Sequence, residues 1–427
     1  MVKQLVAPAA VAVGGFVAVV VLLTRLGGGS LLFDHQDPWR ALIEGDTACA
    51  ALAAVIAVVV SAAVRDRGIA VVLGGAGLVI FGAIALIDTS ATWSSYGLAV
   101  ASGLVVAAAG SEAARGANRS ALQASFIGGA LAGVFLARPL DQYRPRSGYL
   151  GDDVPVGTPA DWPLVIGATV ALLLLAASWF TASKSSADDS RASRVHTGRA
   201  LGLGIAIPVA SVLLWWWFIS TEVLADDADL GTSTWWYGIL LLPLVIGGVL
   251  WLPGRDGLVL AAVLATVAAA ATVPKWQGSW PVLVVFVVLI IGGIWTGRRM
   301  PHPLGAVGVL VVCTLVNISD QSPWKVIGII AAFVVPAAGG HLVAACLPTT
   351  DVLSTVAVTS PAMLYAVTGI TFGLMAAFGG SSVSGFDSYA PNTTELVLSV
   401  VTIVACAAAI VIVTRRRPAV DAEQSCP

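Results

Sequence analysis

The stretch from Ile69 to Ile87 reads IAVVLGGAGLVIFGAIALI, follows Arg67-Gly68, precedes Asp88 and contains no charged residue. About 17–25 mostly apolar residues are enough for a helix to cross the hydrocarbon core of a bilayer. Because lipid offers no hydrogen-bond partner to the backbone, such a segment crosses as an α-helix. The stretch therefore predicts a transmembrane helix.

Similar apolar stretches fill the rest of the chain. Charged residues make up 11% of the sequence, hydrophobic residues 58%, and the mean hydropathy is +0.91, a balance that excludes an ordinary soluble domain. We expect helices at Leu5–Leu23, Thr47–Val64, Ile69–Ile87, Tyr96–Gly110, Ser120–Ala137, Trp162–Ala182, Ala200–Ile219, Trp235–Leu252, Leu258–Val273, Trp280–Trp295, Leu304–Ile318, Val326–Leu347, Leu353–Phe378 and Leu396–Val413. The predicted fold is an all-α polytopic membrane bundle of about fourteen transmembrane helices.

The charges between these helices predict the orientation of the chain. With the N-terminus inside, the inner loops hold fifteen of the 22 Lys and Arg residues, and the outer loops hold sixteen of the 24 Asp and Glu residues. Loops on the cytoplasmic side of membrane proteins carry an excess of Lys and Arg. The pattern predicts a multi-pass protein with both termini inside. The Ala-, Val- and Gly-rich composition, with Arg preferred to Lys, favours a bacterial inner membrane.

A polar segment divides the chain into two groups of helices. Residues 183–199 are rich in Ser and charged residues and have no apolar face, which is typical of a solvated linker. We therefore predict a six-helix bundle over residues 1–182, a cytoplasmic linker over 183–199, a bundle of about eight helices over 200–417 and a cytoplasmic tail over 418–427.

Two short turns on the inner face resemble one another. Residues 65–71 read RDRGIAV and residues 254–260 read GRDGLVL. Any tight inner turn needs glycine and arginine, which explains the likeness, and an ancient duplication is the alternative. Asp66, Arg67 and Gly68, their echo in the second half and the charged central loop resemble the major facilitator superfamily, whose turn reads roughly Gly-x-x-x-Asp-Arg-x-Gly-Arg-Arg. The resemblance implies two pseudo-symmetric bundles that rock around a central cavity.

Few residues within the helices can carry chemistry. No Asp, Glu, Lys or Arg falls near the middle of an expected helix, where ionisable residues usually mark ion pathways. The sequence offers His341 as a titratable group inside a helix, either as a packed core residue or as a proton or substrate site. Further gating or substrate candidates lie near the outer surface: Asp88, Arg138, Asp141, Asn317 and Trp216. These features favour a secondary transporter or flippase that moves an apolar or amphipathic, lipid-linked envelope substrate by alternating access.

Two other functions stay open at this point. Asp34, His35 and Asp37 lie in the first outer loop, where a carboxylate can act as a general base or hold a divalent cation. They would serve a polytopic glycosyl- or acyl-transferase acting on a lipid-linked substrate. The third option is a non-catalytic membrane subunit of an envelope assembly complex, with another membrane protein as partner.

No motif predicts a cofactor, a metal or a nucleic acid. The cysteines are Cys49, Cys313, Cys346, Cys406 and Cys426, and none has metal-ligand spacing. The sequence lacks a Walker loop, a CxxC pair, an HExxH motif and a dinucleotide fingerprint. The partners that the sequence predicts are membrane lipids, a lipid-like substrate and another membrane protein.

Overall fold

The computed structural model describes a chain made of helices. It describes residues 2–25, 46–64, 66–87, 92–115, 118–141, 161–181, 194–223, 237–274, 280–318, 324–350, 352–357, 359 and 393–417, and these ranges contain no strand. Within them, nine helices are long and apolar enough to cross a membrane. The prediction of an all-α, multi-pass membrane bundle is confirmed.

The helices follow the expected order along the chain. The first group is α1 (Val2–Arg25), α3 (Asp46–Ala63), α4 (Arg67–Ile87), α5 (Thr92–Ala113), α6 (Arg119–Asp141) and α7 (Trp162–Thr181). Next come α8 (Arg194–Phe218), continued by a π-helical turn at Ile219–Val223, and α9 (Leu241–Trp251), preceded by a 3-10 turn at Tyr237–Leu240. The last group is α10 (Asp256–Thr272), α11 (Trp280–Arg299), α12 (Pro303–Leu315) with a 3-10 turn at Val316–Ile318, α13 (Trp324–Cys346), a helical segment at 352–357, and α15 (Thr393–Arg416).

Several helix boundaries differ from the sequence prediction, and in three examples the helix extends through charged residues near its end. Helix α5 continues to Ala113, past the expected end at Gly110, and α8 begins at Arg194, before the expected start at Ala200. Helix α11 reaches Arg299 rather than Trp295. In each case the added residues include charged ones, because hydropathy marks only the part of a helix that lies in lipid. Most of the expected helix Leu353–Phe378 lies outside the described residues.

The first six helices pack around a central pair, α1 and α5. Helix α5 packs against α3 and α4, α1 packs against α6 and α7, α1 and α5 pack against each other, and α4 packs against α7. Small residues allow these close approaches, as is common between helices in membranes. A side chain at Gly129 of α6 would overlap the backbone of Ala12 in α1, and one at Gly103 of α5 would overlap the carbonyl oxygen of Ala53 in α3.

The last group of helices repeats this packing pattern. Helix α13 packs against α10, α11 and α12, α10 also packs against α15, and α12 packs against α15. In this group α10 thus takes the place of α1, α11 of α3, α12 of α4, α13 of α5 and α15 of α7. The segment 352–357 follows α13 as α6 follows α5. Helices α8 and α9 have no counterpart and lie between the two groups in the chain.

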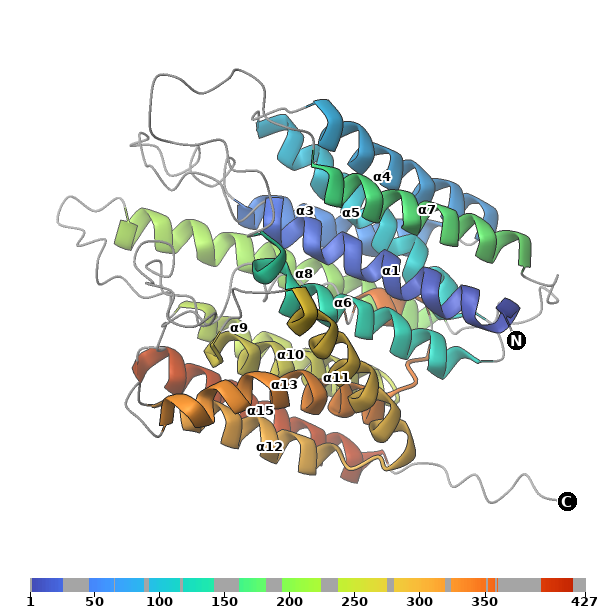
Figure 1. Ribbon diagram of the computed structural model, residues 1–427. Helices are drawn as coiled ribbons and strands as arrows, with labels where there is room; N and C mark the ends of the chain where they lie inside the picture. The colour runs from blue at the N-terminus through green and yellow to red at the C-terminus, as the bar shows by residue number, and fades with distance from the viewer. Residues whose placement is uncertain are drawn as a thin grey trace, which may run out of the picture.

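The two groups lie side by side. In Figure 1 the helices α1, α3, α4, α5 and α7 lie above, α9, α10, α12, α13 and α15 lie below, and α6 and α8 run between them. Helix α6 packs against α11 and α13, and α8 packs against α3 and α9. These contacts form the interface between the halves.

The similarity between residues 65–71 and 254–260 does not follow this repeat. Asp66 and Arg67 begin α4 at the α3–α4 turn, whose packing counterpart is the α11–α12 turn at residues 300–302. Residues 254–257 instead join α9 to α10. This α9–α10 turn depends on Gly254, whose φ of +56° favours glycine. The sequence likeness therefore reflects the shared needs of tight turns between helices rather than equivalent positions in the two halves.

Arg417, the residue that follows α15, holds the α9–α10 turn in place. The guanidinium of Arg417 donates hydrogen bonds to the carbonyl oxygens of Leu252, of Gly254 at 2.9 Å and of Leu250 at 3.1 Å. The last carbonyl groups of a helix have no partner within the helix. Arg417 supplies donors to those at the end of α9.

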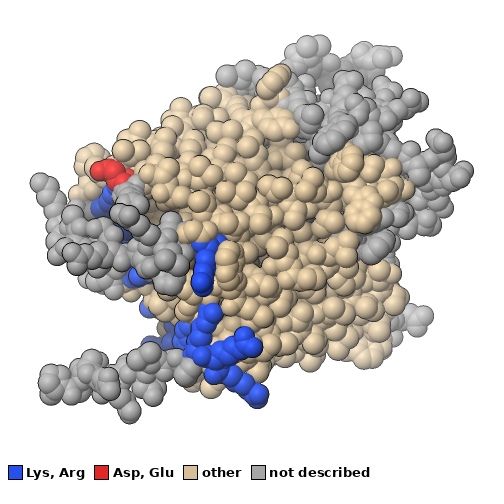
Figure 2. All heavy atoms as spheres, turned by 180° about the vertical axis from the view of Figure 1, so that it is seen from behind, with Lys and Arg blue, Asp and Glu red and all other residues tan. Residues whose placement is uncertain are grey.

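Basic side chains lie at one end of the bundle. The Lys and Arg side chains that the structure describes belong to helix ends or turns at this end: Arg67, Arg115, Arg119, Arg199, Arg255, Arg298, Arg299, Arg415, Arg416 and Arg417. We call it the basic end. Figure 2 shows, on the face seen from behind, Lys and Arg gathered toward one end and an uncharged described surface elsewhere. Large apolar side chains are exposed along the outward faces, as lipid-facing surfaces require.

Candidate functional site

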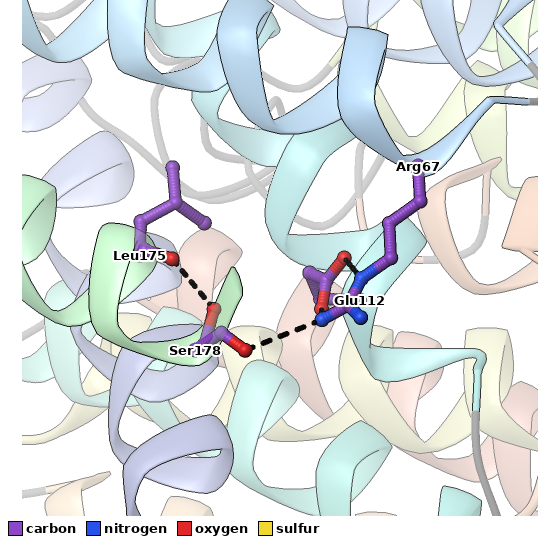
Figure 3. Close-up of polar contacts among 4 residues, drawn as sticks. All are labelled: Arg67, Glu112, Leu175 and Ser178. Carbon is purple, nitrogen blue, oxygen red and sulfur yellow. Dashed lines mark hydrogen bonds and ion pairs between the residues drawn. The ribbon is translucent and has the colours of Figure 1, made fainter. Parts of the chain in front are cut away.

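A buried ion pair joins three helices of the first half at the basic end. The Glu112 carboxylate, 6% exposed, accepts hydrogen bonds from Nε of Arg67 at 2.8 Å and from Nη2 of Arg67 at 2.6 Å. Nη2 of Arg67 also donates to the carbonyl oxygen of Ser178 at 3.5 Å, and the Ser178 hydroxyl donates to the Leu175 carbonyl (Figure 3). The pair therefore ties α4 and α5 to α7, and the Arg67 guanidinium also lies 5.6 Å from the ring centroid of Trp179.

The position of Glu112 explains why it needs this partner. A carboxylate in the last turn of a helix meets the negative end of the helix dipole, and this one is also removed from water. Arg67 offsets both costs. Burial lowers the pKa of the Arg115 guanidinium, the Glu112 carboxylate opposes that shift, and Arg67 adds to it. Asp66, by contrast, lies favourably before α4 and accepts a hydrogen bond from the Ile69 amide at 3.1 Å.

A second set of buried polar groups crosses the interface between the halves. The Gln123 side chain of α6 is fully buried; its Oε1 accepts the Thr349 amide at 3.0 Å, and its Nε2 donates to Oγ1 of Thr355 at 3.2 Å. The hydroxyl oxygens of Thr349 and Thr355 are 2.6 Å apart, and both residues are buried. We call Gln123, Thr349 and Thr355 the inter-half network. It joins the first half to the segment that follows α13.

The same segment is held from its other side by Asp256. This buried carboxylate at the start of α10 accepts the Thr350 amide at 2.8 Å and the Thr350 hydroxyl at 2.5 Å. A side chain at Gly110 of α5 would overlap Val356, so the 352–357 segment also lies tightly against the first half. Residues 349–350 and 352–357 are thus fastened to both halves at the basic end.

The residues singled out from the sequence lie elsewhere. Asp34, His35, Asp37 and Asp88 fall outside the described residues, and the side chains of Arg138 and Asp141, in the last turn of α6, are not described either. Asn317 is buried after α12, and its Nδ2 donates to the Cys313 carbonyl at 2.7 Å. Nδ1 of His341 in α13 lies 3.2 Å from Oγ1 of Thr296. Trp216 is half-buried in α8.

Sequence reasoning singled out Arg67 in its turn but missed Glu112 and the residues of the inter-half network. Glu112 gave a signal, because an acid beside Arg115 and Arg119 stands out at an end dominated by basic residues. Gln123 gave a weaker one as an amide within an apolar helix. Nothing in the sequence around Thr349 or Thr355 distinguishes them from ordinary turn and helix residues.

Comparison with known proteins adds no family assignment. No protein-family model and no curated protein matches this chain. Among the described residues, no group of three or more His, Cys, Asp and Glu side chains could hold a metal ion.

Proposed function

We propose that this chain is a secondary transporter of the major facilitator type, which moves an apolar or amphipathic substrate by alternating access. The repeated helix packing supports this proposal. Many transporters are built from structural repeats, and transport follows from the movement of one repeated unit against the other around a site between them. Here α6 of the first half packs against α11 and α13 of the second half.

The positions of α8 and α9 also support it. They lie outside the repeated packing and between the two groups in the chain. Members of this superfamily with fourteen helices carry an extra pair between their six-helix halves. The same arrangement of six, two and six helices accounts for the order found here.

The inter-half network is the observation that carries the proposal. Gln123, Thr349 and Thr355 bury polar groups at the boundary between the halves, where apolar packing would suffice for a permanent contact. Each such hydrogen bond contributes only about 0.5–1.5 kcal/mol net, because water replaces it when the groups separate. The network therefore suits a gate that opens and closes. With the basic end facing the cytoplasm, this gate is closed on the cytoplasmic side.

The side chains within the bundle favour a substrate without strong charge. The described Asp, Glu, Lys and Arg side chains lie at helix ends, and the buried polar groups deeper in the helices are hydroxyls, such as Ser102, Ser399 and Thr402. An ionised substrate buried among them would lack a counter-charge. We propose an amphipathic substrate, with lipid-linked envelope components as the leading class.

A reversible cross-link across the gate tests the proposal. Gln123→Cys and Thr355→Cys are combined after replacement of the native cysteines, and efflux of the dye ethidium and movement of nitrobenzoxadiazole-labelled lipid are measured in proteoliposomes. Oxidation should abolish movement of any probe that the reduced protein transports, and reduction should restore it. Ala18→Cys with Ser102→Cys, which joins α1 to α5 within one half, is the matched control.

Distances between spin labels provide a readout that needs no known substrate. Labels on the outer surface of α6 and α13 at the basic end should give two distance populations in the reduced protein and one after cross-linking. A single distance in both states would contradict alternating access and favour a static membrane subunit or an enzyme.

A further inference from the structure

The end of α11 and the neighbouring turn gather polar and basic groups on one side of the second half. Thr296, Arg298 and Arg299 belong to the last turn of α11, and Oγ1 of Thr296 lies 3.2 Å from Nδ1 of His341 in α13. Gly297 brings the two helices together, because a side chain there would overlap the backbone of His341. His302 is exposed in the α11–α12 turn, three residues after Arg299. We call Thr296, Arg298, Arg299, His302 and His341 the α11 cluster.

The arginines of this cluster lack the protein partners that Arg67 and Arg417 have. Arg67 is paired with Glu112, and Arg417 binds backbone carbonyl groups. Arg298 and Arg299 are exposed, and no described carboxylate or carbonyl group accepts a hydrogen bond from either of them. The Arg299 guanidinium instead lies over the Trp295 ring, 4.2 Å from its centroid. Their hydrogen-bond donors are therefore available to a ligand.

The charge around the cluster has a single sign. Helices α11, α12 and α13 contain no Asp or Glu between their first and last residues. Helix α15, which packs against α12, adds the exposed Arg415 and Arg416 at the same end. The described surroundings therefore favour an anion.

The surface beside the cluster is apolar and open. Helices α11 and α12 both pack on α13 but make few contacts with each other (Figure 1). Gly292 of α11 and Gly308 of α12 face open space, with no atom within 4 Å of a side chain placed there. Exposed apolar side chains continue along both helices: Val284, Val288, Ile291, Leu304, Val309 and Val312. An occupant would thus meet positive charge at the basic end and hydrocarbon below it.

We propose that the α11 cluster is a binding site for an anionic phospholipid. Arg298 and Arg299 bind the phosphate with charge-assisted hydrogen bonds, His302 supplies a further polar contact, and the acyl chains lie along α11 and α12. A guanidinium matches the geometry of phosphate oxygens, and basic pockets between helices at the cytoplasmic surface suit anionic headgroups. A free phosphate would leave the apolar surface uncovered. The inference does not depend on the transport proposal.

Lipid binding to the purified full-length protein in detergent tests the site. Native mass spectrometry measures binding of dioleoyl phosphatidylglycerol, with dioleoyl phosphatidylcholine and glycerol 3-phosphate as comparisons. The wild-type protein should bind phosphatidylglycerol in preference to phosphatidylcholine, and glycerol 3-phosphate should not compete. Arg298→Gln with Arg299→Gln should weaken phosphatidylglycerol binding by at least about tenfold, because hydrogen bonds to charged groups are lost.

A charge-matched control separates a site from a general surface effect. Arg415→Gln with Arg416→Gln removes the same charge from the same end and should weaken binding by less than about threefold, since only screened long-range attraction is lost. His302→Gln, a milder change within the cluster, should reduce binding without changing the melting temperature in lipid-free detergent. Equal binding of the two lipids, retained binding in the α11 double variant, or equal losses in both double variants would overturn the proposal.

Discussion

Replacing Gln123 by alanine should open the inter-half network. In the structure the Gln123 amide group bridges the Thr349 amide and the Thr355 hydroxyl, and all three residues are buried. Alanine removes both hydrogen bonds and leaves the Thr349 N–H without that acceptor while the gate is closed. In the open state water replaces the lost partner, so the substitution penalises the closed state alone.

The expected size of the effect follows from these contacts. Two hydrogen bonds at about 0.5–1.5 kcal/mol each give a destabilisation of roughly 1–3 kcal/mol for the closed state. Since about 1.4 kcal/mol corresponds to a factor of ten, the ratio of open to closed protein should rise roughly 5- to 150-fold.

Cys346 provides a native reporter for this change. It is 1% exposed at the end of α13, directly before the segment that carries Thr349 and Thr350. In a Cys426→Ser background, the rate of maleimide labelling of Cys346 should rise by the same factor in Gln123→Ala. The control is Thr402→Val, which removes a buried hydroxyl whose bond to Leu398 lies within α15. A labelling rate within twofold of the parent, or an equal rise in the control, would refute the gate.

Three further predictions follow from the packing and the charges. Glu112→Gln should lower the free energy of unfolding by about 2 kcal/mol, and it should lower the melting temperature more than Asp66→Asn. The loss is smaller than the roughly 3–5 kcal/mol expected for a fully buried pair, because Arg67 is 30% exposed. Gly297→Ala should reduce the yield and melting temperature of the purified protein, because the alanine side chain would overlap the His341 backbone. Gly292→Ala, at a position that faces open space, should leave both unchanged, and equal effects of the two substitutions would refute the α11–α13 packing. Cys426 should react with a membrane-impermeant maleimide only after the cells are permeabilised, and labelling of intact cells would contradict the orientation with both termini inside.

The sequence predicts the helices well because lipid imposes one requirement on all of them. An uninterrupted apolar stretch must be helical in a membrane, so α4 and α13 could be located from hydropathy alone. The ends were harder to place. We expected a helix end at Gly110 because Ser111 and Glu112 are polar, yet Arg67 neutralises Glu112 and the helix continues.

The candidate site could not be predicted in the same way. Gln123 lies 226 residues from Thr349 and 232 from Thr355, so no local pattern connects them. Their contact depends on how the two halves pack, which the order of hydrophobic stretches leaves open. The likeness of residues 65–71 and 254–260 is the one sequence feature that suggests how distant parts of the chain correspond, and it connects turns that are not equivalent in the repeat.

Arg417 has a consequence for the biogenesis of the protein. Its guanidinium completes the hydrogen bonding at the end of α9, which is synthesised long before it. During translation α9 and the turn after it are therefore made before the donors that complete their hydrogen bonding. A fusion placed immediately after Arg417 should disturb a turn that lies 163 residues earlier in the chain.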